Sequence, residues 1–261
     1  MLEYLLGQRG SRIARGLLGL GLTLAGWQAL AEFNLINAVL LPSPLTVWGA
    51  LVDSLYDGSL IRHVAASMER VLVGVFLAAV VGLSLGVLLG RSSTVADYCK
   101  PIIEALRPIP PIAWTPLAIL WFGIGNAPSY FLVFIGAVFP VFISTYSAVR
   151  NIERTQINAA LCLGATPTML VRDVLIPGAL PVIFPGLRIA LGVGWMCVVA
   201  AELIAAQSGL GYMIQQSRLL LQTHFVVAGM IAIGIIGFAM NAVMTLIERK
   251  LVPWQESSRA S

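Results

Sequence analysis

The chain has 261 residues, of which 58% are hydrophobic and only 11% are charged, and its formal net charge is +4. Because an ordinary soluble domain carries roughly a quarter charged residues, this composition favours a protein whose solvent is the lipid bilayer. Its basic residues are not interleaved with aromatic ones, so nucleic acid is not a predicted partner. Three cysteines and two histidines show no metal-ligand spacing, and no glycine-rich phosphate loop is present, so we expect this chain to bind no metal or other cofactor.

Six apolar segments are predicted to cross the membrane as helices, because about 20 helical residues span a hydrocarbon core. They cover residues 14–32, 69–90, 107–123, 129–149, 184–206 and 225–247. The first segment also resembles the apolar part of a signal peptide, but the spans that follow it favour a retained anchor. We therefore expect an all-α, multi-pass integral membrane protein with a single transmembrane domain over residues 1–261.

The basic residues predict the orientation of these spans. If the N-terminus lies inside, eleven arginines and lysines of the connecting segments fall on the inner side, and only Arg62 and Arg218 fall outside. Inner loops of membrane proteins carry this excess of positive charge. Both termini and the loop at residues 150–183 are therefore predicted to be cytoplasmic.

Residues 44–57 are predicted to form an amphipathic helix on the outer membrane surface. Pro42 and Pro44 can end one helix and start the next. Apolar side chains then recur at helical spacing, and they include Leu45, Trp48 and Leu55. Trp48 is also a residue type that suits a membrane interface.

The entrance to the third predicted span is rich in proline. Arg107 is followed by Pro108, Pro110 and Pro111, each of which removes a backbone donor and disfavours helix before it. Non-helical backbone at membrane depth is tolerated only where protein or a water-filled cavity surrounds it. The break therefore points either to a transport pathway or to a closely packed neighbour. Arg107 is open to two interpretations: it attracts anions beside the break, or it pairs with Glu104 or reaches back to cytoplasmic water.

The loop at residues 150–183 is predicted to hold two short helices joined by a turn at Gly164. Thr166 is a suitable N-cap, and Pro167 suits the first position of the second helix. We expect that helix to stop at Pro177 and Gly178. Small residues around the turn allow another protein to approach closely, which is typical of a docking element.

Five further residues are candidates for the pathway or its gate, and each has a structural alternative. Arg188 faces a cavity between subunits or binds carbonyl groups near the 150–183 loop. Glu202, which is costly in a span unless partnered, pairs with Arg218 or Arg70 or contacts an external protein. Gly209 and Gly211 form a tight turn at the gate or an ordinary loop. Trp114 is a further candidate, with packing as its alternative.

The loop sequence resembles the cytoplasmic signature of ABC importer permeases, which runs Glu-Ala-Ala, three residues, Gly, nine residues, Ile, any residue, Leu-Pro. Here the matching residues are Asn158-Ala159-Ala160, Gly164, and Val174 through Pro177, at the same spacing. Asn158 stands where the family usually has Glu. The resemblance implies an ATPase-coupling role for Asn158, Ala159, Ala160, Gly164, Ala165, Thr166, Pro167, Leu170, Val174, Ile176 and Pro177.

The resemblance extends to the stretches "LRPIPPIAWTPLAILWFGIG" and "AAELIAAQSGLGYMI", which look most like sulfonate and taurine permeases. It implies a type I ABC importer permease fold in the bacterial inner membrane. The implied partners are a second copy of the chain, two cytoplasmic ATPase subunits that bind ATP and Mg²⁺, a periplasmic binding protein and membrane lipid. The implied cargo is a small anion, with an aliphatic sulfonate or taurine ahead of nitrate or bicarbonate.

Two other classes of function compete with this one. A stand-alone secondary carrier also uses discontinuous helices, but it would leave the 150–183 loop without a purpose. A membrane enzyme needs convergent catalytic groups, which two outer histidines and scattered carboxylates do not supply. We therefore expect no enzymatic activity in this chain.

Overall fold

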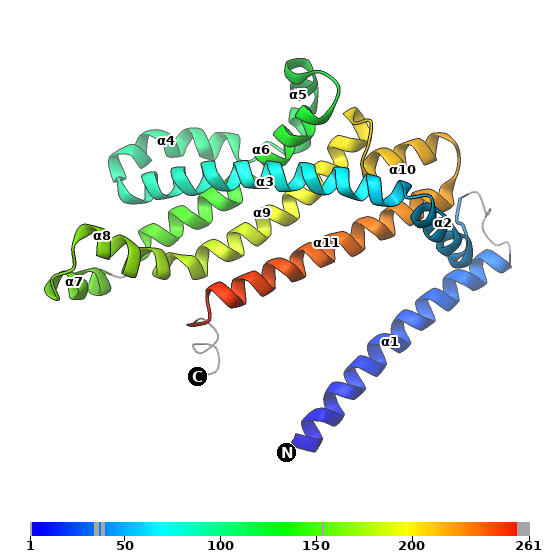
Figure 1. The fold of residues 1–261 in the computed structure, drawn as a ribbon, viewed down its shortest axis with the longest axis horizontal. Coiled ribbons are helices and arrows are strands. Elements are labelled where there is room, and N and C mark those ends of the chain that lie inside the picture. The colour runs from blue at the N-terminus through cyan, green and yellow to red at the C-terminus, as the bar shows by residue number, and fades with distance from the viewer. Residues whose placement is uncertain (1, 34–36, 38–39, 153, 255–261) are drawn as a thin grey trace. The chain divides into compact units, whose positions relative to one another are not determined.

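The computed structural model describes residues 2–33, 37, 40–152 and 154–254. Within these ranges the chain is helical apart from short turns, and no strand occurs, so the predicted all-α class is confirmed. The elements in Figure 1 are α1 (Leu2–Glu32), α2 (Pro44–Tyr56), α3 (Ser59–Arg91), α4 (Ser93–Leu106), the 3-10 helix η1 (Pro111–Trp114), α5 (Thr115–Phe122), α6 (Asn126–Arg150), α7 (Arg154–Cys162), α8 (Pro167–Met169), the π-helix η2 (Leu170–Leu175), α9 (Ile176–Ala205), α10 (Leu210–Leu219) and α11 (Thr223–Leu251).

The chain divides into two compact units, one formed by Met1–Ile61 with Met213–Ala232 and the other by Arg62–Tyr212 with Ile233–Ser261. In the first unit, α2 begins as its sequence predicts. The Ser43 hydroxyl accepts a hydrogen bond from the Thr46 N–H at 3.2 Å, and Pro44 occupies the first turn. This is a serine N-cap with a proline whose missing donor costs nothing.

The face of α2 that packs within the first unit is not its most apolar face. The side chains of Val47 and Ala50 are buried against Ala228 of α11. Leu45 and Trp48, which the sequence places on the apolar face, are 70% and 67% exposed. The predicted helix is confirmed, and its large apolar side chains remain available to a membrane surface.

In the second unit, α3 packs closely on α6 through a stripe of glycines. A Cβ added to any of these glycines would lie within 2.5–2.9 Å of an α6 side chain. The pairs are Gly74 with Val133, Gly82 with Val141, Gly86 with Thr145 and Gly90 with Val149. Residue numbers rise together along the two helices, so α3 and α6 run parallel. Small residues at four-residue spacing allow such close approach in a membrane protein.

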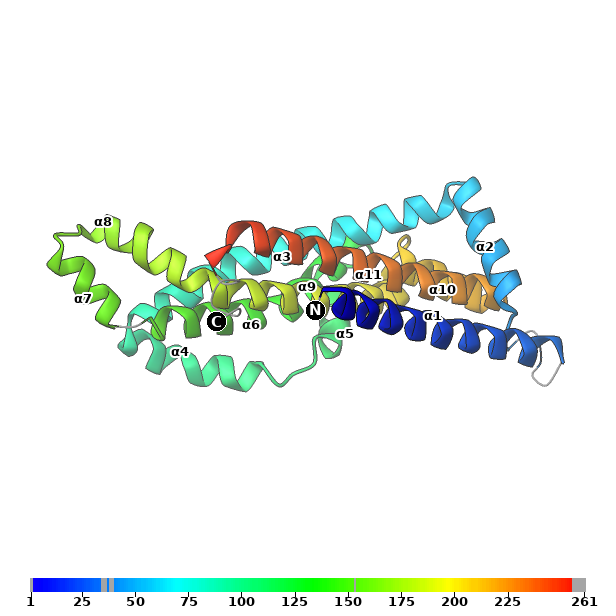
Figure 2. The ribbon, with the colours of Figure 1, turned by 90° about the horizontal axis from the view of Figure 1, so that it is seen from below.

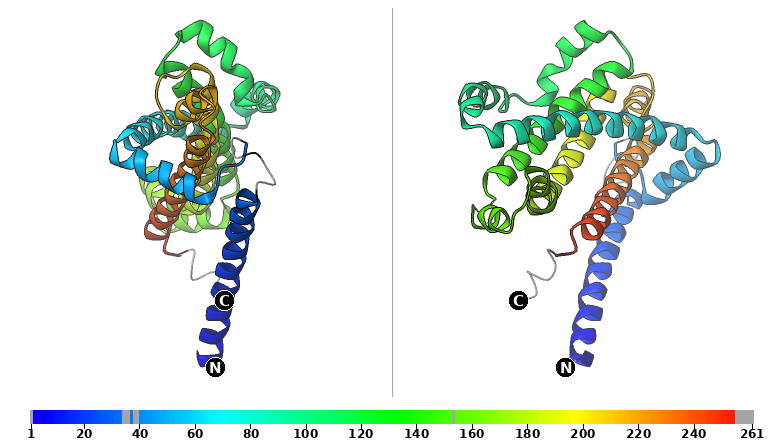
Figure 3. Two further views of the ribbon diagram at one scale, coloured as in Figure 1. Left: turned by 90° about the vertical axis from the view of Figure 1, so that its right-hand side faces the viewer. Right: turned by 60° about the vertical axis from the view of Figure 1, so that its left-hand side comes forward.

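Helix α9 runs antiparallel to α6 and forms an extensive contact with it, and the two lie side by side in Figures 1 and 3. Their contact buries Ala137, Val141 and Ala190. Gly136 again allows close approach, because a Cβ there would lie 2.6 Å from the sulfur of Cys197. Glycine and alanine at these contacts therefore let α3, α6 and α9 approach closely.

Four described helical segments are long and apolar enough to cross a membrane: Ser59–Arg91, Asn126–Arg150, Leu170–Ala205 and Thr223–Leu251. They contain the predicted spans 69–90, 129–149 and 225–247, and all of 184–206 except its last residue. The predicted span 14–32 lies within α1, which is one continuous helix of 31 residues. The number of crossings and the side on which each terminus lies remain predictions.

The structure differs from the expected span at 107–123. Residues 107–110 are not helical, and the apolar helix that follows covers only Pro111–Phe122. Figure 2 shows this non-helical segment between α4 and α5. A helix of that length is about 18 Å long and does not cross a hydrocarbon core of about 30 Å. The proline cluster breaks the helix as predicted, but it removes enough helical length that the segment is not a continuous span.

Candidate functional site

The predicted docking element is an exposed helix and turn. Helix α7 ends at Cys162, and Gly164 adopts a positive φ of 83°. The Ala165 N–H donates to the Ala160 carbonyl at 3.0 Å, and the Gly164 N–H donates to the Leu161 carbonyl at 3.0 Å. This hydrogen-bond pattern is the glycine C-cap of a helix, which favours glycine because its φ is positive. The predicted glycine turn is therefore confirmed.

The surface of this element is open and partly apolar. Asn158 and Ala159 are exposed, and Leu161 and Leu163 are 52% and 89% exposed. A Cβ on Gly164 would meet no atom of the described chain within 4 Å. Large apolar side chains around a small-residue turn are typical of a surface that another protein covers.

The second helix of the loop begins as predicted but does not stop as predicted. The Thr166 hydroxyl accepts from the Met169 N–H at 3.4 Å, which confirms it as a cap. However, α8, the π-helix η2 and α9 follow one another without a break, so the expected stop at Pro177 and Gly178 is wrong. Ile176 donates to the carbonyl of Val171, five residues earlier. The wider π turn gives room for Pro177, whose ring would clash with an α-helical carbonyl.

As a result, the candidate coupling residues divide into two groups. Asn158, Ala159 and Ala160 lie on α7, with Gly164, Ala165 and Thr166 in the turn. The others lie on the helical run that continues into the bundle, and they are Pro167, Leu170, Val174, Ile176 and Pro177. Figure 1 shows α7 and α8 at one end of the α6–α9 pair.

The segment at residues 107–111, called the proline segment below, forms one wall of a hollow beside α6 and α9. The hollow has a volume of about 370 Å³, and Arg107 and Pro111 line it together with Gly136 and Ser144. The Glu104–Arg107 pair, one of the alternatives from the sequence, is not formed. The Glu104 carboxylate instead lies 3.8 Å from the Lys100 ammonium. The hollow therefore brings together two of the predicted pathway residues, Arg107 and Pro111.

Trp114 packs against other residues of the chain. Its ring lies edge-on to Phe131, with 6.4 Å between centroids. Its indole N–H is buried and has no hydrogen-bond partner among the described residues. Packing, the structural alternative, describes this geometry.

Arg188 pairs with a carboxylate that the sequence did not suggest, and its position relative to a cavity between subunits remains a prediction. Its guanidinium forms an ion pair with the carboxylate of Glu248 on α11. The two residues are 60 positions apart, so no local pattern indicated the pair. The contact joins α9 to α11, at the ends of these helices that are predicted to be cytoplasmic.

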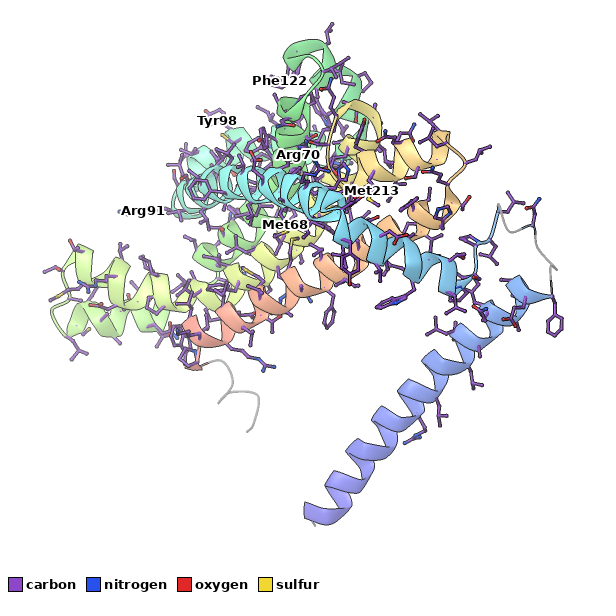
Figure 4. The ribbon with its side chains drawn as sticks, turned by 45° about the vertical axis from the view of Figure 1, so that its right-hand side comes forward. Met68, Arg70, Arg91, Tyr98, Phe122 and Met213 are labelled. Carbon is purple, nitrogen blue, oxygen red and sulfur yellow. The ribbon has the colours of Figure 1, made fainter. Side chains whose placement is uncertain are left out.

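Glu202 pairs with Arg70, one of the two partners predicted for it, and not with Arg218. The Arg70 guanidinium donates to the Glu202 carboxylate at 2.6 Å, and both side chains are almost wholly buried. Arg70 also donates to the Ser208 carbonyl at 2.6 Å and to the Asn126 side-chain oxygen at 2.7 Å. Ser67 donates to Glu202 at 2.9 Å. Figure 4 shows Arg70 on α3 within this region.

The two glycines after α9 let the backbone close around that carboxylate. Gly209 has a φ of 109°, and a Cβ there would overlap the Glu202 carboxylate. The Gly211 N–H donates to Glu202 at 2.9 Å, and the Gly209 N–H donates to the ring of His63 at 3.1 Å. The predicted tight turn is present, and it contacts the partly buried His63 of α3 and the buried Glu202 of α9.

Sequence reasoning missed four members of this cluster: His63, Ser67, Asn126 and Ser208. A signal for two of them exists, because His63, Ser67 and Arg70 are spaced by four and three residues, and so lie on one face of an apolar helix. A polar stripe of that kind in a span calls for buried partners. Asn126 gives no such signal, since its role depends on the fold bringing the start of α6 to α3.

The sequence and the fold agree with known transporter subunits. Residues 74–256 match the family "Binding-protein-dependent transport system inner membrane component". The chain is 40% identical over 240 residues to the taurine transport system permease protein TauC of Escherichia coli, which covers 90% of this chain and 87% of that protein. It is 35% identical to a putative aliphatic sulfonates transport permease of Bacillus subtilis, and the match covers 93% of this chain and 88% of that protein.

Another relative is the nitrate import permease protein NrtB of Leptolyngbya laminosa, at 33% identity, covering 87% of this chain and 83% of that protein. Among solved structures, the inward-facing MetNI methionine ABC transporter superimposes with a TM-score of 0.66 at 23% identity, covering 75% of this chain and 97% of that one. These relatives and neighbours are permeases of ABC transporters, which rules out the stand-alone carrier and the enzyme as alternatives. The chain belongs to the family of binding-protein-dependent transport system inner membrane components, and it is a membrane-embedded permease subunit of an ABC importer.

Proposed function

We propose that this permease imports a small sulfonate, of which taurine is the first candidate, into the cytoplasm. Two copies of the chain would form the pathway, two ATPase subunits would bind ATP and Mg²⁺, and a periplasmic protein would deliver the cargo. The support is the 40% identity to a taurine permease and 35% identity to a sulfonate permease, against 33% to a nitrate permease. Nitrate and bicarbonate are the next candidates.

One observation carries the proposed coupling to ATP. The exposed α7 ends at the turn around Gly164, and from Pro167 onward the chain runs through α8, η2 and α9 without a helical break. Helix α9 in turn has an extensive contact with α6. A push on the turn would therefore be passed to the α6–α9 pair by continuous helix, which suits a switch between two packings of the bundle. This chain would contribute motion and a pathway, with no bond made or broken in it.

The experiment is ATP-driven uptake into liposomes that contain the permease with its ATPase and binding protein. Taurine, nitrate and bicarbonate are supplied separately, and uptake without ATP is the baseline. We expect ATP-dependent accumulation of taurine and little of the inorganic anions. Accumulation of nitrate instead of taurine would contradict the substrate, and uptake without ATP would contradict the coupling.

The coupling role is tested by Gly164→Asp, with Gly164→Asn as its matched control. Both side chains are of one size and both tolerate a positive φ better than most residues, and a Cβ at this position meets no atom of the described chain within 4 Å. We expect Asp to abolish uptake, because it places a charge in the ATPase contact, while Asn keeps a measurable rate. Equal uptake by Gly164→Asp and the unmodified protein would remove this turn from the coupling mechanism.

A further inference from the structure

The hollow beside the proline segment has the form of a small binding site. Its volume of about 370 Å³ falls within the range of about 300–1,000 Å³ that is usual for ligand pockets. Its walls come from three segments: the proline segment, α6 and α9. Gly136 contributes to the floor, since a Cβ there would lie 3.4 Å from the Pro111 ring. A larger residue would reduce the space between α6 and the proline segment.

The polar groups of this hollow are few and are not occupied by other residues. Arg107 is the single charged residue among those that line it. Its guanidinium has no ion pair or hydrogen bond to another described residue, and Glu104, three residues earlier, lies 3.8 Å from the Lys100 ammonium. The Ser144 hydroxyl, also in the lining, likewise makes no hydrogen bond within the described chain. The remaining lining is apolar, with Ile109, Phe139 and Ile189 among its members.

This combination matches the chemistry of a sulfonate better than that of a cation or a neutral solute. A guanidinium presents parallel N–H donors that suit two oxygens of one oxyanion, and it keeps its charge at any physiological pH. A hydroxyl supplies a further donor. Apolar walls lower the local dielectric constant and so strengthen the attraction between the arginine and an anion. A carboxylate in the lining would oppose the anion, and none is present among the described residues.

We propose that this hollow holds the charged head of a small oxyanion between the Arg107 guanidinium and the Ser144 hydroxyl during its passage through the membrane. The inference rests on the proposed import of sulfonates, and it assigns the contact point within the membrane subunit.

A second hollow extends the first along the same side of α6 and α9. It has a volume of about 380 Å³ and shares Pro111 and Val193 with the first. Its other lining residues are apolar or sulfur-containing, and they include Met196 and Cys197. In the predicted orientation this second hollow lies toward the outside. An anion entering there meets no charge until it reaches Arg107, so that arginine is placed to draw it inward past Pro111.

The test measures charge selectivity by thiol labelling of a cysteine placed in the hollow. Ile189 is 58% exposed and lines the hollow, so Ile189→Cys is made with the three native cysteines changed to alanine. The assembled complex, in inside-out membrane vesicles without ATP, is treated with an anionic thiol reagent that carries an ethanesulfonate group and with a cationic reagent of similar size. We expect faster reaction with the anionic reagent, and slower labelling when free ethanesulfonate is added.

Arg107→Gln should reduce the ratio of anionic to cationic labelling rates on the order of tenfold, the effect of one charge in a partly apolar site. Arg107→Lys should keep most of the preference. The matched control is Ile235→Cys on α11, which is 60% exposed and does not line the hollow. Its ratio should not respond to Arg107→Gln.

The proposal would be overturned if Arg107→Gln left the ratio of anionic to cationic labelling rates at Ile189→Cys unchanged. Arg107 would then be a side chain that only reaches to solvent. Labelling needs neither ATP nor transport, so this result is separable from a failure of the proposed function. The latter would appear as absent uptake of taurine by the unmodified complex.

Discussion

The buried pair Arg70–Glu202 is the most constrained polar feature of the second unit. Burying two charges costs several kcal/mol per ion and is offset only when the remaining donors and acceptors are also satisfied. That condition is met here, because Asn126 and Ser208 accept from Arg70 and Gly211 donates to Glu202. The cluster therefore ties the turn after α9 to α3 and to the start of α6. We interpret it as a clamp that fixes this end of the helix bundle.

Glu202→Gln should destabilise the protein strongly. The amide keeps the size of the carboxylate but leaves the Arg70 charge buried without a counter-ion, which typically costs about 3–5 kcal/mol. The measurement is thermal unfolding of the purified complex in detergent, followed by loss of the folded permease. The control is the pair of changes Arg70→Met with Glu202→Leu, which removes both charges and should recover much of the loss. A Glu202→Gln protein as stable as the unmodified one would contradict the clamp.

At the scale of single residues, the sequence predicts which charged side chains need a partner better than it predicts which residue that partner is. Glu202 had to be partnered because an acid in a span is costly when bare, and Arg70 was one of two candidates. Arg188 had to be satisfied too, yet its partner Glu248 lies 60 residues away on another helix. Which helices become neighbours is decided by packing over the whole bundle, and no local spacing carries that information.

At the scale of elements, the glycine stripe of α3 sets how closely α3 and α6 approach. The contact uses glycine in one helix and β-branched side chains in the other, as in the pairs Gly86 with Thr145 and Gly82 with Val141. Helices in lipid gain little from the hydrophobic effect, so close van der Waals packing provides much of their association. The four-residue spacing of the stripe is visible in "GLSLGVLLG", and the pair Gly82 and Gly86 predicts a close helix contact of this kind.

Gly86→Ala should therefore separate the two helices. The added Cβ would lie 2.5 Å from the Cβ of Thr145 and 3.1 Å from the Phe142 carbonyl oxygen. These are atoms on or next to backbone, so a helix must move, at a cost of about 1–3 kcal/mol for overpacking. Gly234→Ala is the matched control, because its Cβ meets nothing within 4 Å. There the better helix propensity of alanine should leave stability unchanged or raise it by up to about 1 kcal/mol.

The same thermal unfolding assay, applied to both variants, decides this prediction. A loss of stability confined to Gly86→Ala supports the close contact. Equal behaviour of the two variants would mean that α3 can shift along α6 without cost, and the stripe would then have no structural role.

The sequence predicts where helices begin better than where they end. The predicted helix start at Pro44 and the predicted cap at Thr166 depend on residues next to each other in the chain, and both are present. The end predicted at Pro177 is wrong because a π turn before it accommodates the ring. The helix predicted at 107–123 is too long. The sequence shows that the proline cluster breaks the helix, but the number of helical residues lost depends on the path of the backbone.

At the scale of the whole molecule, the two sides of the membrane differ in what the chain presents to them. The predicted inner side carries most of the connecting arginines and lysines and the exposed turn at Gly164, and the predicted outer side carries α2 with its exposed Trp48. An importer needs this asymmetry, because ATP is hydrolysed on one side and cargo arrives on the other. The orientation is therefore the property on which the coupling proposal depends most.

Native Cys162 reports this orientation directly. It ends α7, it is exposed, and it lies two residues before the Gly164 turn. With Cys99 and Cys197 changed to alanine, a membrane-impermeant thiol reagent should label Cys162 in inside-out vesicles and not in right-side-out vesicles. Tyr56→Cys, at an 89% exposed position on α2 and made with all native cysteines removed, should show the reverse pattern. Labelling of Cys162 in sealed right-side-out vesicles would place the loop outside and exclude contact with a cytoplasmic ATPase.

The same cysteine then distinguishes a docked loop from one that is merely cytoplasmic. When the ATPase subunits are stripped from inside-out vesicles, Cys162 labelling should accelerate, because the covering subunit is gone, and adding the subunits back should slow it again. Tyr56→Cys labelling, followed in right-side-out vesicles with and without ATPase subunits in the membrane, should not change. An inside-facing Cys162 whose rate ignores the ATPase would leave the positive-inside orientation intact. It would, however, require the ATPase to contact a different cytoplasmic surface, and the Gly164 variants would then lose their reason to affect uptake.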